Sequence, residues 1–408
     1  MASAGIGAIV AGTVVSPAGT APRRGDQLEV VETYAPGAVA WAGEELTYVG
    51  PPGGLPADLP VERFERSTVV PGFVDCHTHV PFIGWRADEF ELRLSGSSYR
   101  EQHREGGIAR SARMFAEAPD DEILAFSLEL LQEMAANGTT TVEMKTGYGL
   151  SVEAELRAAR LARRLGEQAP QTCVVTLLAC HTVPAGFTRE EWVRVACDEL
   201  IPAAAAEGLM DAVDIYVEDI AFTVRDLEAV AEAAHRAHLP LRCHADQLGA
   251  SGASQAAIAL DARSIDHCNH IDRAGIDALG SSEAVAVVLP GSTFLLRATP
   301  PLVSGMLDAG AAVAIATDCN PGTAPIASMP EIISFACVLY GLSPHAALTA
   351  CTVNAAHVLG LGGRVGALRP GFRADLVVLD GEGFREVPYR PGHDPVLATY
   401  IGGARVAG

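Results

Sequence analysis

Two histidines, His77 and His79, stand one residue apart at the end of the apolar run "PGFVDCHTHV" (71–80). Successive side chains of a strand point to opposite faces, so both imidazoles would lie on one side and could hold one ion. Neutral imidazoles combined with a carboxylate suit zinc or iron. An H-x-H pair also arises by chance, and a lone buried histidine is more often a hydrogen-bonded core residue. The pair therefore predicts a metal site only if further ligands exist elsewhere.

Polar residues of the right types end other strand-like runs along the chain. If these runs are the strands of a barrel, their carboxyl ends share one mouth, where barrel enzymes place their chemistry. Taken singly, Asp318 could simply cap the next helix, and Glu218 could be a solvated loop residue. The combination of the H-x-H pair with His244, His267 and Asp318 is harder to obtain by chance and favours a shared site. The residues that end these runs are Lys145, Tyr148, His181, Glu218, His244, His267 and Asp318.

The elements that must position these residues alternate between strand and helix over about residues 70–365. Eight short apolar runs read as strands, from "STVVPGFVDCH" to "AVAIATDC". In "DDEILAFSLELLQEMAANG", Leu124, Leu128, Leu131 and Ala135 recur at helical spacing, and Gly138 provides a natural stop. Eight strands that alternate with helices predict an α/β protein with a TIM-type (β/α)8 barrel.

The two ends of the chain differ from this middle part. Short β-like pieces broken by Gly and Pro fill residues 1–70, and "ADLVVLD" and "VLATYIGGARV" near the C-terminus are similar, with Gly402-Gly403 as a hairpin turn. We expect residues 1–70 and 365–408 to pair into one small β-domain. Residues 71–364 would then form the catalytic barrel.

Composition limits the classes of partner. The 408 residues are 49% hydrophobic and carry a net charge of −21, which predicts a large core and argues against nucleic acid or an anionic membrane surface. No apolar run reaches the roughly 20 residues that a membrane span needs, and the N-terminus lacks the basic region of a signal peptide. Nine cysteines without a CxxC pair indicate reduced thiols, and so a cytoplasmic protein.

The motifs resemble those of the amidohydrolase superfamily, whose members are distorted barrels with a small β-sandwich built from both chain ends. "PGFVDCHTH" is similar to its first-strand motif and "ADLVVLD" to its return to the sandwich. Within the superfamily the closest resemblance is to the imidazolonepropionase family. It rests on "HTHVPFIGWRADEFELRL", "TTTVEMKTGYGLS", "ACHTVP", "HADQLG", "ATDCNPGTAP" and "PYRPG", and covers nearly the whole chain.

This resemblance implies a reaction and a set of site residues. The reaction is the metal-dependent hydrolysis of 4-imidazolone-5-propanoate to N-formimidoyl-L-glutamate in histidine degradation. One divalent metal ion, Zn²⁺ or Fe²⁺/Fe³⁺, would be bound by His77, His79, His244 and Asp318. Substrate contacts would come from Arg86, Tyr148, His181, Gln247, Asn320, Gly322 and Thr323. A homodimer is also implied.

Two of these roles also agree with simple chemistry. A planar arginine suits the carboxylate arm of the substrate, although Arg86 taken alone could be a solvated loop charge. Asp318 would take the proton of the attacking water, assisted by His267, while the metal and His181 stabilise the oxyanion. Lys145 lies outside the fourth-strand position where related enzymes bridge two metals, so we expect a structural role for it and one metal ion.

Gln247 separates two branches of the superfamily. Cytosine- and guanine-type deaminases use a glutamate at this spacing to protonate the ring, and an amide cannot transfer a proton. We therefore count Gln247 as an orienting member of the catalytic set and expect ring opening rather than deamination. Two other hypotheses stay open: an amide or amidine hydrolase or deaminase with another heterocyclic substrate, and a catalytically inactive barrel that binds a ligand or partner.

Overall fold

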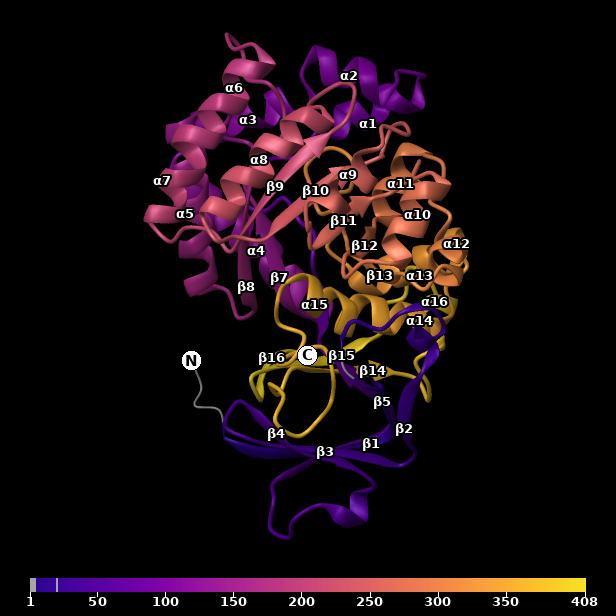
Figure 1. Cartoon of the computed structure of the whole chain (residues 1–408). Helices are drawn as coiled ribbons and strands as arrows, with labels where there is room; N and C mark the ends of the chain where they lie inside the picture. The colour runs from indigo at the N-terminus through magenta and orange to yellow at the C-terminus, as the bar shows by residue number, and fades with distance from the viewer. Residues whose placement is uncertain (1–4, 20) are drawn as a thin grey trace.

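The computed structural model describes residues 5–19 and 21–408. These residues form two eight-stranded sheets. One is parallel and curls into a barrel, and the other is mixed and lies below it, with strands from both ends of the chain side by side (Figure 1). The predicted fold class is confirmed, with the expected sandwich built as a single mixed sheet.

Each of the eight apolar runs predicted from the sequence contains one barrel strand. Neighbouring strands pair in parallel and in chain order, and helices cover the outside, so nearly every strand residue is buried. The strands are β6 (Phe73–Asp75), β7 (Thr139–Lys145), β8 (Thr172–Cys180), β9 (Ala212–Val217), β10 (Leu241–Ala245), β11 (Ser264–His267), β12 (Val285–Val288) and β13 (Ala312–Ile315).

The segments that follow the first and last strands close the barrel. The backbone N–H of Asp318 donates to the carbonyl of His77, and that of His79 donates to the carbonyl of Cys319, each over 2.9 Å. Below them, the Asp75 carboxylate accepts from the Thr317 hydroxyl over 2.6 Å. This closure brings the H-x-H pair next to Asp318, although 238 residues or more separate them in the chain.

Helices connect successive strands and cover the barrel. The first three lie at the end opposite the small sheet (Figure 1). The helices are α1 (Ala87–Leu94), α2 (Tyr99–Glu105), α3 (Gly107–Glu117), α4 (Asp120–Ala136), α5 (Val152–Gln168), α6 (Arg189–Val195), α7 (Ile201–Ala206), α8 (Val224–Arg236), α9 (Ala253–Ala259), α10 (Arg273–Gly280), α11 (Pro290–Leu296), α12 (Val303–Asp308), α13 (Met329–Tyr340), α14 (Pro344–Thr349), α15 (Ala355–Val358) and α16 (Glu386–Tyr389). Short 3-10 turns are η1 (Gly25–Glu29) and η2 (Pro52–Gly54), and π-helical turns are η3 (Ala196–Leu200) and η4 (Ala350–Asn354).

Helix α4 shows how the sequence pattern sets the packing. Leu124, Leu131 and Ala135 are buried and Leu128 is half-buried, as their helical spacing predicts. The helix ends before Gly138, whose φ of 89° is a left-handed value that glycine adopts easily.

The small sheet runs in the order β16-β15-β14-β5-β1-β3-β4, with β2 paired to β1. Its strands are β1 (Ile6–Pro17), β2 (Val31–Tyr34), β3 (Gly37–Ala42), β4 (Glu45–Gly50), β5 (Val61–Pro71), β14 (Leu376–Asp380), β15 (Val396–Ile401) and β16 (Ala404–Ala407). Gly402 and Gly403, both at positive φ, form the predicted turn between β15 and β16. The run "STVVPGFVDCH" is divided, because β5 ends in the small sheet and β6 begins in the barrel.

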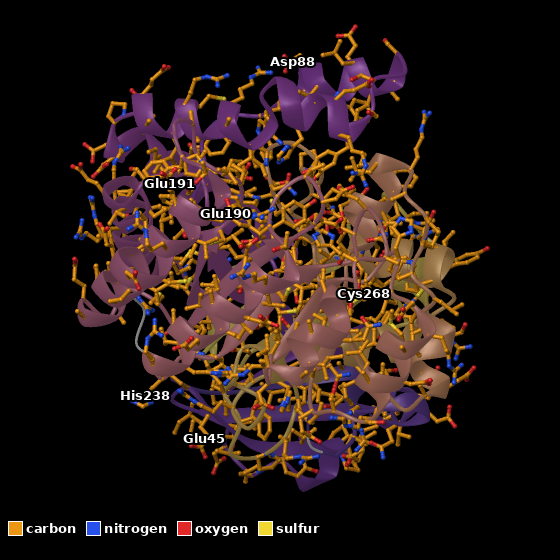
Figure 2. The ribbon with its side chains drawn as sticks, turned by 45° about the horizontal axis from the view of Figure 1, so that its top comes forward. Glu45, Asp88, Glu190, Glu191, His238 and Cys268 are labelled. Carbon is orange, nitrogen blue, oxygen red and sulfur yellow. The ribbon has the colours of Figure 1, made fainter. Side chains whose placement is uncertain are left out.

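In Figure 2, Asp88 on α1 and Glu45 in the small sheet lie toward opposite ends of the view. The nine cysteines are free thiols. Within the described ranges, no helix combines the length and the apolar character that crossing a membrane requires.

Candidate metal centre and active site

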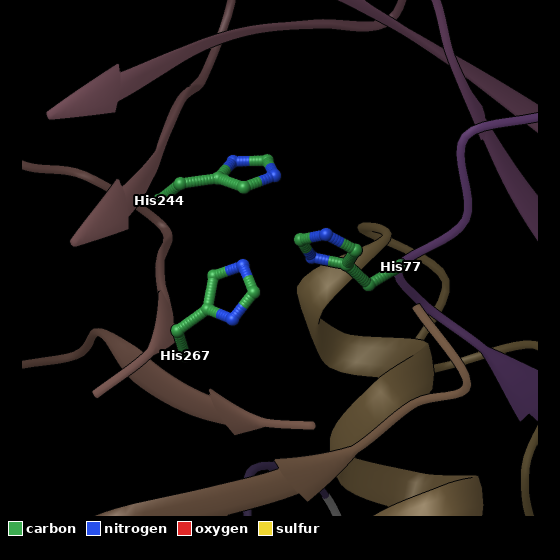
Figure 3. Close-up of side chains that lie close together, drawn as sticks. All are labelled: His77, His244 and His267. Atoms are coloured by element: carbon green, nitrogen blue, oxygen red, sulfur yellow. The ribbon is translucent and has the colours of Figure 1, made fainter. Parts of the chain in front are cut away.

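Five of the predicted residues meet at the mouth of the barrel. His77 and His79 follow β6, His244 lies in β10, His267 ends β11, and Asp318 follows β13. Two groups of three could each hold an ion, with one ligand atom per residue and all three atoms within 4.8 Å of one another. The first group is His77, His79 and Asp318, and the second is His77, His244 and His267 (Figure 3).

The distances join the two groups into one cluster. Nε2 of His77 and Nε2 of His79 lie 3.6 and 3.3 Å from Oδ1 of Asp318. The ring centroids of His77 and His244 are 4.5 Å apart, and those of His244 and His267 are 5.3 Å apart. The predicted ligands His77, His79, His244 and Asp318 are therefore together, with His267 beside them.

The donor atoms of this cluster fit a cation. Nε2 of His77, Nε2 of His244 and Nδ1 of His79 are buried, and among the described residues none of these atoms has a hydrogen-bond partner. Buried polar atoms are normally hydrogen-bonded, so the unpartnered Nε2 atoms of His77 and His244 suit a cation. His79 faces Asp318 with Nε2, so its unpartnered Nδ1 does not belong to this set. Burial, followed by nearby cations, holds the pKa values of His77 and His79 well below the ordinary value, which keeps both rings neutral as ligands must be.

Two buried aspartates orient the histidines from behind. Nδ1 of His77 lies 2.6 Å from Oδ2 of Asp266, and Nδ1 of His244 lies 3.1 Å from Oδ1 of Asp214. A carboxylate fixes the tautomer that leaves Nε2 free for a metal. Neither aspartate is among the site residues predicted from the sequence. The sequence feature that could have identified them is a carboxylate inside an otherwise apolar strand, in "AVDIYVED" and "ARSIDHC".

His267 and Asp318 share an unusual backbone conformation. Their φ angles are 79° and 57°, values that residues other than glycine rarely adopt. Such strain is found most often at functional sites. Burial lowers the pKa of His267 to about 3 and raises that of Asp318, although His267 and His244 partly offset the second effect.

A pocket opens in front of this cluster and brings most of the predicted substrate contacts together. His77 and Gly322 are not among the residues that line it. The predicted residues that line it are His79, Arg86, Tyr148, His181, His244, Gln247, His267, Asp318, Asn320 and Thr323. Tyr99, Ile108 and Tyr216 also line it, and the sequence analysis missed them.

Arg86 is a buried wall of this pocket, not the solvated loop charge of the alternative interpretation. Its side chain is 4% exposed and Nη1 donates to the Gly107 carbonyl over 2.8 Å and to the Ser111 hydroxyl over 2.7 Å. Nε lies 3.1 Å from Oε2 of Glu89. Within the described residues, no hydrogen bond from Nη2 is found, and Arg86 lines the pocket.

Gly322 leaves room for the guanidinium. A Cβ atom at this position would lie 1.7 Å from Nη2 of Arg86 and 2.4 Å from its Cζ. Asn320 shapes the turn, because its Oδ1 accepts from the backbone N–H groups of Gly322 and Thr323 over 2.9 and 2.7 Å. The predicted "NPGT" turn therefore also fits closely around Arg86.

His181 and Tyr148 line the same pocket. Nδ1 of His181 lies 3.0 Å from the Gly147 carbonyl, and its ring stacks on that of His79 with centroids 5.2 Å apart. A carbonyl only accepts, so Nδ1 carries the proton. Burial, together with His79 and His244, keeps the pKa of His181 well below normal, so Nε2 has a lone pair facing the pocket. Burial raises the pKa of Tyr148, which stays a phenol.

Gln247 is held from two sides. The Tyr216 hydroxyl donates to its Oε1 over 2.8 Å, and Oε1 of Glu218 accepts from its backbone N–H over 2.5 Å. With Oε1 occupied, the amide N–H groups are the part of Gln247 that can reach a substrate. Glu218 is thus not the solvated residue we expected: it is 3% exposed, and burial raises its pKa to about 7.

Comparisons with known proteins agree with this geometry. A family model described as "Amidohydrolase family" matches residues 68–406. The chain is 41% identical to an imidazolonepropionase of Rubrobacter xylanophilus over 95% of each chain. It is also 41% identical to that of Rhizorhabdus wittichii, over 91% of this chain and 94% of the relative.

Solved structures show the same fold at much lower identity. A zinc-bound adenosine deaminase from Xanthomonas campestris superposes with a TM-score of 0.72 at 19% identity, over 98% of this chain and 92% of that one. A guanine deaminase from C. acetobutylicum gives 0.71 at 14% identity, over 98% and 99%. The chain therefore belongs to the amidohydrolase family and, within it, to the imidazolonepropionases.

Proposed function

We propose that this protein hydrolyses 4-imidazolone-5-propanoate to N-formimidoyl-L-glutamate. One observation carries the proposal: a cluster of unpartnered histidine nitrogens with a carboxylate shares a pocket with one buried arginine. The first group suits hydrolysis of a C–N bond, and the second suits a substrate with a carboxylate arm. A relationship of 41% identity to imidazolonepropionases supports the same reaction.

His77, His79, His244 and Asp318 would bind one divalent ion, zinc or iron. When bound, such an ion supplies Lewis acidity and lowers the pKa of water from about 16 toward about 7. Side chains of the protein itself transfer the proton and bind the substrate.

Asp318 takes the proton of the attacking water and then delivers it to the ring nitrogen that leaves. A carboxylate beside the reacting atoms can accept this proton and return it. Water adds to the ring amide carbonyl, the C–N bond breaks, and the nitrogen gains the proton, so the atoms balance as one hydrolysis. His267, neutral because burial lowers its pKa to about 3, directs the water through a hydrogen bond.

Arg86 would hold the propanoate through the edge that carries Nη2. Asn320, Gly322 and Thr323 form the turn beside it, and Tyr148 supplies a neutral hydroxyl. Gln247 orients the ring through its amide N–H groups.

His181 takes a role other than the expected stabilisation of an oxyanion. Its Nδ1 donates to the Gly147 carbonyl, so the neutral ring offers a lone pair at Nε2 and no proton. We assign it to accept a hydrogen bond from a ring N–H of the substrate.

The proposal also covers the oligomeric state, the cellular location and the domain boundaries. We propose a homodimer in the cytoplasm, with residues 71–364 as the catalytic unit and residues 1–70 and 365–408 as the small domain.

The test measures opening of the substrate ring directly. Metal-loaded protein is mixed with freshly generated imidazolone-propanoate, and loss of ring absorbance is recorded with NMR detection of the product. We expect N-formimidoyl-glutamate from the loaded protein, none after chelation, and none from Asp318→Asn. Intact substrate in the presence of metal-loaded protein would refute the proposed reaction, and near-normal turnover by Asp318→Asn would refute the role of this base.

A further inference from the structure

A second group of charged side chains lies directly beneath the histidines, inside the barrel. Glu143 and Lys145 come from β7, Asp214 from β9, Arg242 from β10 and Asp266 from β11. Each side chain is at most 1% exposed. Charged side chains are almost never buried so completely unless they are paired. The positive and negative charges of this group must therefore largely neutralise one another.

Lys145 lies between three carboxylates. Its Nζ is 2.7 Å from Oδ2 of Asp214, 3.0 Å from Oε1 of Glu143 and 3.7 Å from Oδ2 of Asp266. Arg242 pairs with Glu143 and lies 2.9 Å from Asp266. Among the described residues Arg242 has no ion pair with Asp214, so Lys145 is the cation that balances Asp214 from this group.

The net charge of this group depends on Lys145. Three carboxylates against one ammonium and one guanidinium leave one net negative charge, and loss of the ammonium would leave two. Burial opposes the charged form of Lys145, but Asp214, Glu143 and Asp266 outweigh it and raise the pKa of the lysine. The position therefore holds a permanent cation.

The surroundings of this ammonium are also those of a metal ion. Ligand atoms of Asp214, His244 and Asp266 lie within 4.8 Å of one another, a third group that could hold an ion. Two of its three members contact Lys145 Nζ. The same two aspartates hold His244 and His77 in place, so this position is joined to the metal centre above it.

We infer that the ammonium of Lys145 occupies a second cation position beneath the metal centre and so restricts the protein to one divalent ion. This inference rests on the proposed function, since that supplies the first ion. It gives Lys145 a positioning role: the lysine balances the aspartates that orient His77 and His244.

The test is to remove the charge while keeping the length of the side chain. Lys145→Met is purified in the presence of Mn²⁺, and the bound metal is counted per chain. We expect one Mn²⁺ in the wild-type protein and two in Lys145→Met. We also expect exchange coupling between the two ions in the EPR spectrum of the variant and an uncoupled signal from the wild type.

A charge-matched variant serves as the control. Lys145→Met combined with Asp214→Asn removes one cation and one carboxylate, and the Asn amide oxygen still accepts from Nδ1 of His244. This double variant should bind one Mn²⁺ and give the uncoupled signal.

The outcomes separate this inference from the proposed function. A folded Lys145→Met protein with one Mn²⁺, a wild-type protein with two, or a loss of folding that no concentration of Mn²⁺ reverses would each overturn the role of Lys145. A wild-type protein that binds no metal, or binds it without hydrolysing the imidazolone, would overturn the proposed function instead.

Discussion

Nδ1 of His77 lies 2.6 Å from Oδ2 of Asp266, and both side chains are fully buried. The carboxylate accepts the ring proton and so directs the lone pair of Nε2 toward the metal centre. Removal of such a partner typically lowers metal affinity about 10–100-fold. We expect Asp266→Ala to show a loss of this size in a competition titration with a chelating indicator.

The related variants of this position sharpen the test. Asp266→Asn keeps an oxygen that accepts the ring proton and should lose less affinity than Asp266→Ala. Asp198→Ala changes an exposed aspartate and should bind metal as the wild type does. Equal affinities for Asp266→Ala and the wild type would show that Asp266 does not orient His77.

Arg86 should determine the affinity for the carboxylate arm. Arg86→Lys keeps the charge but loses the planar fork, which a buried ion pair with a carboxylate needs. We expect kcat/KM to fall by about 100-fold, a change of about 2.7 kcal/mol, mainly through a higher KM. Steady-state kinetics of Arg86→Lys and of Arg110→Lys, a partly exposed arginine on α3, would check this. An unchanged KM in Arg86→Lys would place the carboxylate elsewhere.

Gly322 should act through the same arginine. In Gly322→Ala the new methyl group would lie 1.7 Å from Nη2 of Arg86, so the guanidinium has to move. We expect a raised KM with unchanged metal content. Gly363→Ala, where a Cβ atom meets nothing within 4 Å, is the matched control and should behave as the wild type. Identical kinetics for the two variants would contradict the close fit around Arg86.

The barrel strands and the metal ligands could be predicted from the sequence for the same physical reason. Each barrel strand is a short apolar run, and its functional residue is the polar residue at its end, as with His244 and Asp318. The partners behind the ligands were harder to find. Lys145 meets Asp214 across 69 residues, and that contact depends on the register between strands.

The missed pocket residues have a different cause. Tyr99 and Ile108 lie on α2 and α3, in the long connection between β6 and β7. No periodic pattern relates these helices to the barrel mouth. Glu218 was misjudged because its burial comes from the loop that carries Gln247, whose backbone N–H it accepts.

Glu218 should make stability depend on pH. Burial raises its pKa from 4.5 to about 7, so between these values the folded protein holds a proton that the unfolded chain has released. The free energy of unfolding therefore falls as pH rises through this window. We expect Glu218→Gln to gain thermal stability over the wild type at pH 8 and to lose that advantage near pH 4.5.

Thermal unfolding between pH 4.5 and 8 measures this effect. Glu228→Gln, at an exposed position of α8, should follow the wild-type curve throughout. A difference between Glu218→Gln and the wild type that stays constant with pH would contradict the assigned titration.

The measurement that tests the central claim most directly is a titration of metal-free protein with Zn²⁺ or Fe²⁺, in which N-formimidoyl-glutamate formation is recorded at each step. One site made by His77, His79, His244 and Asp318 predicts no product without metal, a linear rise in rate, and a plateau at one ion per chain. Product formation by the metal-free protein, or intact substrate after one equivalent is bound, would contradict the account.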